Sequence, residues 1–386
     1  MSSVIIEVVV AAVATMACGE SFQSKVEESW STLFSAKYGE KTGLLYGTFP
    51  KNVKSASEFK DGIFKWEKGI KGGYGQGMGD TTLVGGVSLS MLCDRYAVLK
   101  DEYSAKYASK LARGLFNVAT VPGHEGFVAR GICYEDGRSI CSLSSIDQVT
   151  HWYHGLWRYY RSPMCTDSNK AEIRRLFELV LHRILKEATP ENNYAFLQAD
   201  GTPDPRGICG VWGNVNPHCG ARLVSFIAAT WDVTGKSEWK NLYEKYIDES
   251  LEKSLVLTTT PSSKYKGIMP TYSILQMNSS LEVIRGVEKN MERIAKVDKC
   301  MARGAEIAEE RALDMKANPG KKWYGMSPDA EIALSQLMAP AWKFNDTDIE
   351  ILRAKLDALK ISDLSTFDIS HFAAAYWRAR VRGIEI

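Results

Sequence analysis

The feature that most constrains this chain is an alternation of short and long connections between segments with helical periodicity. Twelve segments carry apolar residues at helical spacing. They are residues 21–37, 80–99, 102–119, 145–161, 168–187, 218–234, 237–256, 271–284, 287–317, 327–339, 346–360 and 368–382. After the first segment, short connections such as 100–101 alternate with longer ones such as 120–144. Short connections join antiparallel neighbours, and long loops are where function usually lies.

The segments that follow long connections differ in character from those that follow short ones. Residues 146–160 and 218–231 are apolar or aromatic on most sides, whereas 168–187, 237–256 and 287–317 are amphipathic and charged. A helix that is apolar all round is buried, and an amphipathic helix is peripheral. Six buried helices alternating with six outer ones predict an all-α fold, the closed (α/α)6 toroid, with the long loops at one rim. The alternative is an irregular α-solenoid; a true repeat array is disfavoured, because the segments show no self-similarity at a fixed period.

The composition limits the classes of partner. Lys and Arg number 48 against 46 Asp and Glu, so the net charge is only +2, which excludes a general electrostatic grip on nucleic acid or on an anionic membrane. The chain has 10 Trp, 17 Tyr and 31 Gly, and aromatic side chains in polar, Gly-rich loops suit flat, weakly polar ligands such as sugars. We therefore expect an oligosaccharide or polysaccharide partner, no nucleic acid and no membrane span.

The amino terminus has the character of a targeting segment. Residues 4–17 form an apolar run of about signal-peptide length, too short to span a bilayer, and the small residues before Cys18 are compatible with cleavage and lipid attachment there. The lack of Lys or Arg before the run, and Glu7 within it, favour a buried first helix or strand instead. We predict a signal or lipoprotein segment over 1–18 and a single toroid domain over 19–386. The protein is then exported to the periplasm, the cell surface or the medium, with a cytoplasmic location as the alternative.

The cysteines leave two alternatives open. The 8 Cys show no CxxC spacing, which argues against a structural zinc site. Cys133 and Cys141 flank a turn, and Cys209 and Cys219 bracket a Gly-rich loop. Each pair is compatible with a disulfide in an exported protein and equally with buried thiols.

The first turns of the buried helices supply the strongest catalytic candidate. The sequence Ser145-Ile146-Asp147-Gln148 is typical of a helix start. Asp147, His151 and His154 are spaced i, i+4, i+7, so they share one helix face with Asp147 nearest the rim. Asp147 is either a first-turn acid that stabilises the helix dipole or a catalytic carboxylate at the mouth of an aromatic cleft.

Three more residues are candidates for acid/base work or anion binding. Asp80, in Gly79-Asp80-Thr81-Thr82, begins the preceding buried helix and is either a second catalytic carboxylate or a plain helix cap. Glu125 lies between loop residues His124 and Gly126 and is a third catalytic candidate. Arg130 is either a bidentate clamp for a substrate carboxylate or an arginine that braces its loop.

The remaining substrate-binding candidates are histidines and aromatic residues of the rim and its helices. They are His151, His154, Trp212, His218, Tyr272, Trp323 and Tyr324. Trp212 and Trp323-Tyr324 are either sugar-stacking platforms or loop anchors. His151 and His154 lack the intervening Glu of zinc-protease helices, so we predict packed histidines, no metal and no cofactor.

Two motifs carry a family resemblance. Gly126-Phe127-Val128-Ala129-Arg130-Gly131, and the stretch from Ser145 through Gly155-Leu156-Trp157-Arg158-Tyr159-Tyr160, resemble the six-hairpin, (α/α)6-toroid glycosidase superfamily. Within it, the chain looks most like the unsaturated glucuronyl and rhamnogalacturonyl hydrolases and related secreted carbohydrate enzymes. The resemblance implies a rim aspartate that protonates the 4,5 double bond of a sugar and activates water. Asp147 matches that role here, with Asp80 as its partner.

These observations favour a glycoside hydrolase that acts on an oligosaccharide, including one that contains uronic acid. Two carboxylates would perform the acid/base work, and Arg130 and the helix amino termini would hold an anionic sugar. A polysaccharide lyase that uses Tyr153 or Tyr272 with His151 is the second hypothesis. A carbohydrate-binding protein without catalysis is the third. The sequence has no DDxxD-type diphosphate box, which disfavours a terpenoid cyclase or a prenyltransferase.

Overall fold

The computed structural model describes most of the chain: residues 22–47, 63–64, 78–134, 136–189, 191, 195–202, 219–256, 270–319, 324–325, 327–358 and 365–386. The first helix described covers residues 22–37. The others are α2 (Thr81–Leu99), α3 (Glu102–Asn117), α4 (Ile146–Arg161), α5 (Asp167–Glu187), α6 (Arg222–Thr234), α7 (Ser237–Leu255), α8 (Thr271–Val287), α9 (Met291–Ala317), α10 (Pro328–Met338), α11 (Asp346–Ala358) and α12 (Thr366–Val381). The strands are two residues long: β1 (Tyr38–Gly39) pairs antiparallel with β2 (Leu44–Leu45), and β3 (Ile63–Phe64) pairs parallel with β4 (Ile140–Cys141).

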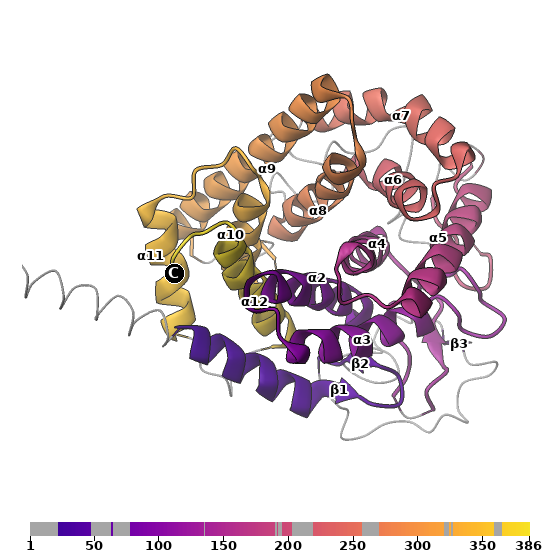
Figure 1. Ribbon diagram of the computed structural model, residues 1–386, viewed down its shortest axis with the longest axis horizontal. Helices are drawn as coiled ribbons and strands as arrows, with labels where there is room; N and C mark the ends of the chain where they lie inside the picture. The colour runs from indigo at the N-terminus through magenta and orange to yellow at the C-terminus, as the bar shows by residue number, and fades with distance from the viewer. Residues whose placement is uncertain are drawn as a thin grey trace, which may run out of the picture.

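The helices form two concentric rings (Figure 1). The inner ring is α2, α4, α6, α8, α10 and α12; each of these contacts the next, and α12 returns to contact α2. Residues 22–37, α3, α5, α7, α9 and α11 lie outside it. The predicted (α/α)6 toroid is therefore confirmed. In addition, α4 contacts α8, the next helix but one around the ring, so these two non-adjacent inner helices also meet inside it.

Burial follows the character of each helix. On outer helix α5, Ile173, Phe177, Leu181 and Ile184 are buried on one stripe, as the periodicity predicts. On inner helix α10, every residue from Ala330 to Met338 is buried. Charged side chains on the inner helices are therefore exceptional, because each must find a partner inside the ring.

Two glycines allow α2 and α4 to approach closely. A Cβ on Gly86 of α2 would lie 2.1 Å from the carbonyl oxygen of His151 on α4, and a Cβ on Gly155 would lie 2.5 Å from the carbonyl oxygen of Gly86. The two backbones pack at a distance that only glycine permits. This contact fixes the first turn of α4 beside that of α2, and with it the relative position of Asp80 and Asp147.

Several other expectations can be compared with the structure. Among the described residues, α2 alone is long and apolar enough to cross a membrane by length and composition, and most of that stretch is buried inside the protein. Cys133 and Cys141 are both buried thiols, so no disulfide joins this pair. Residues 1–18 and Cys209 lie outside the described residues.

Candidate functional site

The amino ends of four inner helices meet at one rim, which we call the mouth. The backbone N–H of Leu83, in the first turn of α2, donates to Oε1 of Gln148 in α4 at 2.8 Å. Arg222, the first residue of α6, donates from Nη1 to Asp147 Oδ1 at 2.8 Å and from Nη2 to Gln276 Oε1 at 2.7 Å. Because Gln276 lies on α8, one arginine links α4, α6 and α8. The long connections therefore do lead to a shared rim.

Asp80 is held at the mouth by loop and helix together. Its side chain makes no hydrogen bond to cap α2, so its interpretation as a plain cap is wrong. Instead Oδ1 pairs with the Arg130 guanidinium and accepts a hydrogen bond from Gln148 Nε2 at 2.6 Å. Arg130 Nε also donates to the Gly79 carbonyl oxygen at 2.6 Å. Arg130 thus braces its loop against Asp80, and its fork already holds a carboxylate of the protein.

Asp147 occupies the first turn of α4, as predicted. Ser145 caps that helix by accepting a hydrogen bond from the Gln148 backbone N–H at 3.5 Å. The Asp147 side chain is 29% exposed, whereas its partner Arg222 is only 1% exposed. Among the described residues, all hydrogen bonds to the Asp80 and Asp147 side chains fall on Oδ1. The described contacts thus anchor each carboxylate through a single oxygen, Oδ1.

His151 lies one turn below Asp147 and is buried. Within the part of the chain that the structure describes, its Nδ1 has no hydrogen-bond partner. Burial lowers the pKa of His151 well below its usual range, and the nearby His154, His371 and Arg222 lower it further. The ring is therefore neutral at neutral pH.

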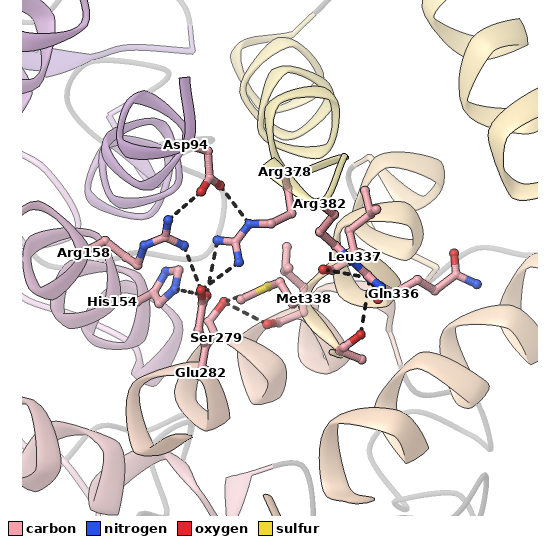
Figure 2. Close-up of polar contacts among 12 residues, drawn as sticks. Asp94, His154, Arg158, Ser279, Glu282, Gln336, Leu337, Met338, Arg378 and Arg382 are labelled. Carbon is pink, nitrogen blue, oxygen red and sulfur yellow. Dashed lines mark hydrogen bonds and ion pairs between the residues drawn. The ribbon is translucent and has the colours of Figure 1, made fainter. Parts of the chain in front are cut away.

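His154, one turn further on, belongs to a different group of residues, which we call the floor cluster. Its members are Asp94, His154, Arg158, Glu282 and Arg378 (Figure 2). Asp94 accepts from Arg158 Nη2 at 2.5 Å and from Arg378 Nε at 2.8 Å. Glu282 accepts from the same two arginines at 2.8 and 2.7 Å and pairs with His154 Nε2 at 2.8 Å. The floor cluster therefore joins α2, α4, α8 and α12 near their carboxyl ends, away from the mouth.

Burial and charge oppose each other in the floor cluster. Burial alone would raise the pKa of Glu282, but the charges of Arg378 and Arg158 and the hydrogen bond with His154 hold it well below its usual value. Burial lowers the pKa of His154, and Glu282 only partly offsets this. Two carboxylates then face two guanidinium groups and a neutral imidazole, so the charges balance.

The interior between mouth and floor is nearly filled. A small pocket there is lined by polar groups of Ser90, Asp94, His151, His154, Ser279 and Arg378. A roomier groove lies outside the inner ring between α9, α10 and α11, where Leu313, Ile332 and Ile351 make it largely apolar. The acid/base groups lie on the inner helices, so the mouth and not this groove is the candidate site.

Three further candidates, Glu125, Tyr324 and Tyr272, lie among the described residues. Glu125 is exposed, and its carboxylate accepts the Gly123 backbone N–H at 3.1 Å; hydrogen bonds from its own backbone N–H and from that of Gly123 lower its pKa. Tyr324 is buried and donates to Asp314 Oδ2 at 2.7 Å, so it acts as a loop anchor. Tyr272, in the first turn of α8, lies close enough to Arg222 to affect its pKa. Only Tyr272 joins the mouth.

Three candidates, Trp212, His218 and Trp323, lie outside the described residues. Conversely, sequence reasoning did not identify Arg222 as part of the site. The available signal was a charged residue at the start of an otherwise apolar segment. Among the described residues, no group of three His, Cys, Asp or Glu side chains is placed to hold a metal ion.

Comparisons with known proteins bear on the fold. No protein-family model matches the sequence, and no curated protein does either. A sugar epimerase from a ruminal bacterium is 13% identical, with 95% of this chain and 100% of that chain covered and a TM-score of 0.59. A β-1,3-1,4-glucanase from Paenibacillus sp. X4 is 12% identical, with 95% and 93% covered and a TM-score of 0.52. A cellobiose 2-epimerase from Spirochaeta thermophila DSM 6192 is 12% identical, with 94% and 97% covered and a TM-score of 0.51.

At such low identity the likeness establishes the fold alone. It extends over nearly the whole of each chain, so the toroid is shared from end to end. The (α/α)6-toroid fold that the resemblance implies is thereby confirmed. The finer resemblance to unsaturated uronyl hydrolases stays a prediction.

Proposed function

We propose that this protein is a carbohydrate-active enzyme, a glycoside hydrolase that cleaves an oligosaccharide at the mouth of the toroid. The observation that carries the proposal is the pair of partly exposed carboxylates on adjacent inner helices. Asp80 is 27% exposed and Asp147 is 29% exposed, and each is fixed by an arginine through Oδ1. Hydrolysis of a glycosidic bond requires two carboxyl groups that flank it in a fixed geometry.

The anchoring suits that chemistry. A carboxylate that swings freely loses much of the rate advantage of a positioned group, because the reacting atoms must be held in line. Here Gln148 bonds to both Asp80 and the first turn of α2, so the two acidic positions belong to one braced unit. Asp80 and Asp147 would divide the acid/base work: one carboxyl group protonates the glycosidic oxygen as its bond to the sugar carbon breaks, and the other takes a proton from the water that attacks that carbon. The fold is also compatible with such work, since the solved structures it matches include a glucanase.

A second reaction, proton transfer at a sugar carbon, is favoured by one specific observation. Neutral His151 lies beneath Asp147, its Nδ1 has no partner among the described residues, and a neutral imidazole accepts protons. A lyase or an epimerase needs such a base, and two of the matching structures are of epimerases. Tyr153 does not take part, because it is buried and donates to the Phe177 carbonyl oxygen at 3.0 Å. Tyr272 is the tyrosine left for a lyase.

The test is an activity panel on the full chain. Mixed-linkage β-glucan, cellobiose and oligosaccharides ending in saturated or unsaturated uronic acid are incubated with the wild type, Asp147→Asn and Asp80→Asn. Asp298→Asn is the matched control, because Asp298 is 28% exposed and paired with Arg285 on the outer surface. Removal of an acid/base group reduces turnover about 10²- to 10⁴-fold.

The product identifies the reaction. New reducing ends indicate hydrolysis, a new near-ultraviolet absorbance indicates a lyase, and a changed sugar without cleavage indicates an epimerase. The proposal predicts reducing ends that the control variant still releases and the two mouth variants do not. Full activity in both mouth variants would remove Asp80 and Asp147 from the site.

A further inference from the structure

We propose that the groove between α9, α10 and α11 is a second binding site, for a small amphipathic cation: an apolar chain that ends in an ammonium group. Helix α10 belongs to the inner ring and contacts both α9 and α11, which lie outside it (Figure 1). The groove is therefore separate from the interior of the toroid. This inference goes beyond the proposed function and does not depend on it.

The groove is both roomy and apolar. Its volume is about 200 Å³, and a cavity of about 150 Å³ already holds a benzene ring. Its apolar walls are formed by Leu313, Ile332, Ala333, Ile351, Leu352 and Phe372. Two of these large side chains remain open to solvent, since Leu313 is 63% exposed and Ile351 is 45% exposed. Covering them removes apolar surface from water, so a chain of about six to eight carbons suits the groove.

The charged side chains that line the groove are mostly acidic. They are Glu309 of α9, Asp329 of α10, and Asp348 and Lys355 of α11. Lys355 pairs with Asp329 at 3.0 Å, so Glu309 and Asp348 are in excess. Asp348 Oδ2 accepts the Asn345 backbone N–H at 3.0 Å. Neither Glu309 nor Asp348 forms an ion pair within the part of the chain that the structure describes, so the groove has an excess of negative charge.

The two excess carboxylates lie on opposite walls of the groove. Burial raises the pKa of Glu309, and the charges of Asp348 and Glu306 raise it further. Burial also raises the pKa of Asp348. A positive group between α9 and α11 would offset the repulsion between these acids, whereas a carboxylate would add to it. The groove therefore favours a ligand with a cationic head and an apolar chain that follows the walls.

Other occupants match the groove less well. A fatty acid or a uronic acid would bring another carboxylate to a site that already has an excess of them. The apolar segment 4–17 of this chain carries Glu7 and no Lys or Arg, so its charge also has the wrong sign. A neutral sugar offers little apolar surface to cover Leu313 and Ile351. An amphipathic cation satisfies both the charge and the apolar walls.

The experiment is titration calorimetry of the full chain with octylammonium, 1-octanol and octanoate, at neutral pH and below the concentrations at which they form micelles. The three compounds share one apolar chain and differ in the charge of the head group. We expect octylammonium to bind at one site about fivefold more tightly than 1-octanol, as a partly exposed ion pair implies. Octanoate should bind more weakly than 1-octanol. Hexylammonium should bind about tenfold more weakly than octylammonium, because two methylene groups are lost.

Variants locate the binding site. Glu309→Gln should bring the affinity for octylammonium to within about twofold of that for 1-octanol, because one of the two excess charges is gone. Glu310→Gln is the matched control, since Glu310 is the next residue of α9, does not line the groove and pairs with Arg303 at 3.4 Å. It should bind like the wild type. Leu313→Gln should weaken the binding of octylammonium and 1-octanol alike, about fivefold, because it removes an apolar wall. Leu313 is largely exposed, so this variant should still fold.

Several results would overturn the proposal. Equal affinities for the three head groups, or tighter binding of octanoate, would rule out a cation site. Unchanged octylammonium binding in both Glu309→Gln and Leu313→Gln would place the ligand elsewhere on the protein, and an absence of saturable binding would rule out the site altogether. Because no readout requires turnover, a failed hydrolase proposal remains distinguishable from a failed groove.

Discussion

The mouth and the floor cluster both pair carboxylates with arginines, but they bury those carboxylates to different depths. In the floor cluster Asp94 is 2% exposed and Glu282 18%, whereas Asp80 and Asp147 at the mouth are 27% and 29% exposed. In the floor cluster each carboxylate bridges two arginines and each arginine bridges two carboxylates (Figure 2). At the mouth, each carboxylate pairs with one arginine among the described residues. Carboxylate–arginine pairs therefore join the inner helices in the floor cluster, and at the mouth they position the candidate catalytic groups.

The largest effect on stability is expected in the floor cluster. Asp94→Asn would leave Arg158 and Arg378 to share Glu282 inside the ring, with one positive charge uncompensated. Removing one partner of a buried ion pair costs about 3–5 kcal/mol. Chemical denaturation of the variant should show that loss in the free energy of unfolding. A loss below about 1 kcal/mol would mean that water reaches the floor cluster and that the comparison with the mouth is wrong.

The next largest effect is expected in the pH dependence of stability, because the ring contains buried histidines. Burial lowers the pKa of His151, His154 and His371, so near pH 6.5 the unfolded chain takes up protons that the native protein does not. The free energy of unfolding should therefore fall as the pH drops below about 6.5, by about 1.4 kcal/mol per pH unit for each proton. Glu282, whose pKa is lowered, adds a further loss only below its unfolded value near 4.5.

The contribution of the floor cluster to that slope can be isolated with His154→Gln. This variant should lose stability less steeply between pH 6.5 and 5, because one of the buried imidazoles is gone. His182→Gln, on the outer helix α5 where the side chain is exposed, is the control and should follow the wild type. The measurement is urea denaturation across the pH range. Parallel curves for all three proteins would show that His154 is already charged in the native state.

A smaller effect on stability is expected at the mouth. In Asp80→Asn the pair with Arg130 is lost, but both side chains reach solvent, at 27% and 18% exposure. Such a pair contributes about 1 kcal/mol or less. Denaturation of this variant should therefore show a far smaller change than Asp94→Asn, even where its turnover is abolished. A loss as large as that of Asp94→Asn would make Asp80 a structural residue and remove the distinction between the two regions.

The sequence predicts the helices of the toroid well and its charge pairs poorly. The segments 168–187 and 145–161 agree closely with α5 and α4, because periodicity, a capping residue and a following break are local signals. Where the caps are less clear, the boundaries shift: α6 begins at Arg222, not 218, and α9 at Met291, after Asn290 caps it, not at 287.

In the candidate site, too, local features could be predicted from the sequence and long-range pairings could not. Helical spacing alone predicts that Asp147, His151 and His154 share a face. In the structure, Asp147 pairs with a residue of α6 and His154 with a residue of α8. Their partners Arg222 and Glu282 come from helices far along the chain, and no local pattern encodes which charges meet. Only the rarity of a charge on an apolar helix marks such residues, and it does not separate a mouth residue from a floor residue. Mouth residues differ from floor residues in how deep they lie in the ring, and that depth is known only once the chain has folded.

The smallest effect is expected for a pair on the outer ring, which provides the baseline for the comparison. Glu172 and Arg175 on α5 pair at 2.6 Å across one turn, with side chains 33% and 54% exposed. Solvent screens such a pair, and holding two long side chains in one geometry costs entropy, so Glu172→Gln should change stability by about 0.3 kcal/mol. Denaturation in low and high salt tests this, because added salt should shrink the difference further. If this pair rivalled Asp94, ion-pair strength would not depend on depth in the ring, and burial would no longer distinguish the floor from the mouth.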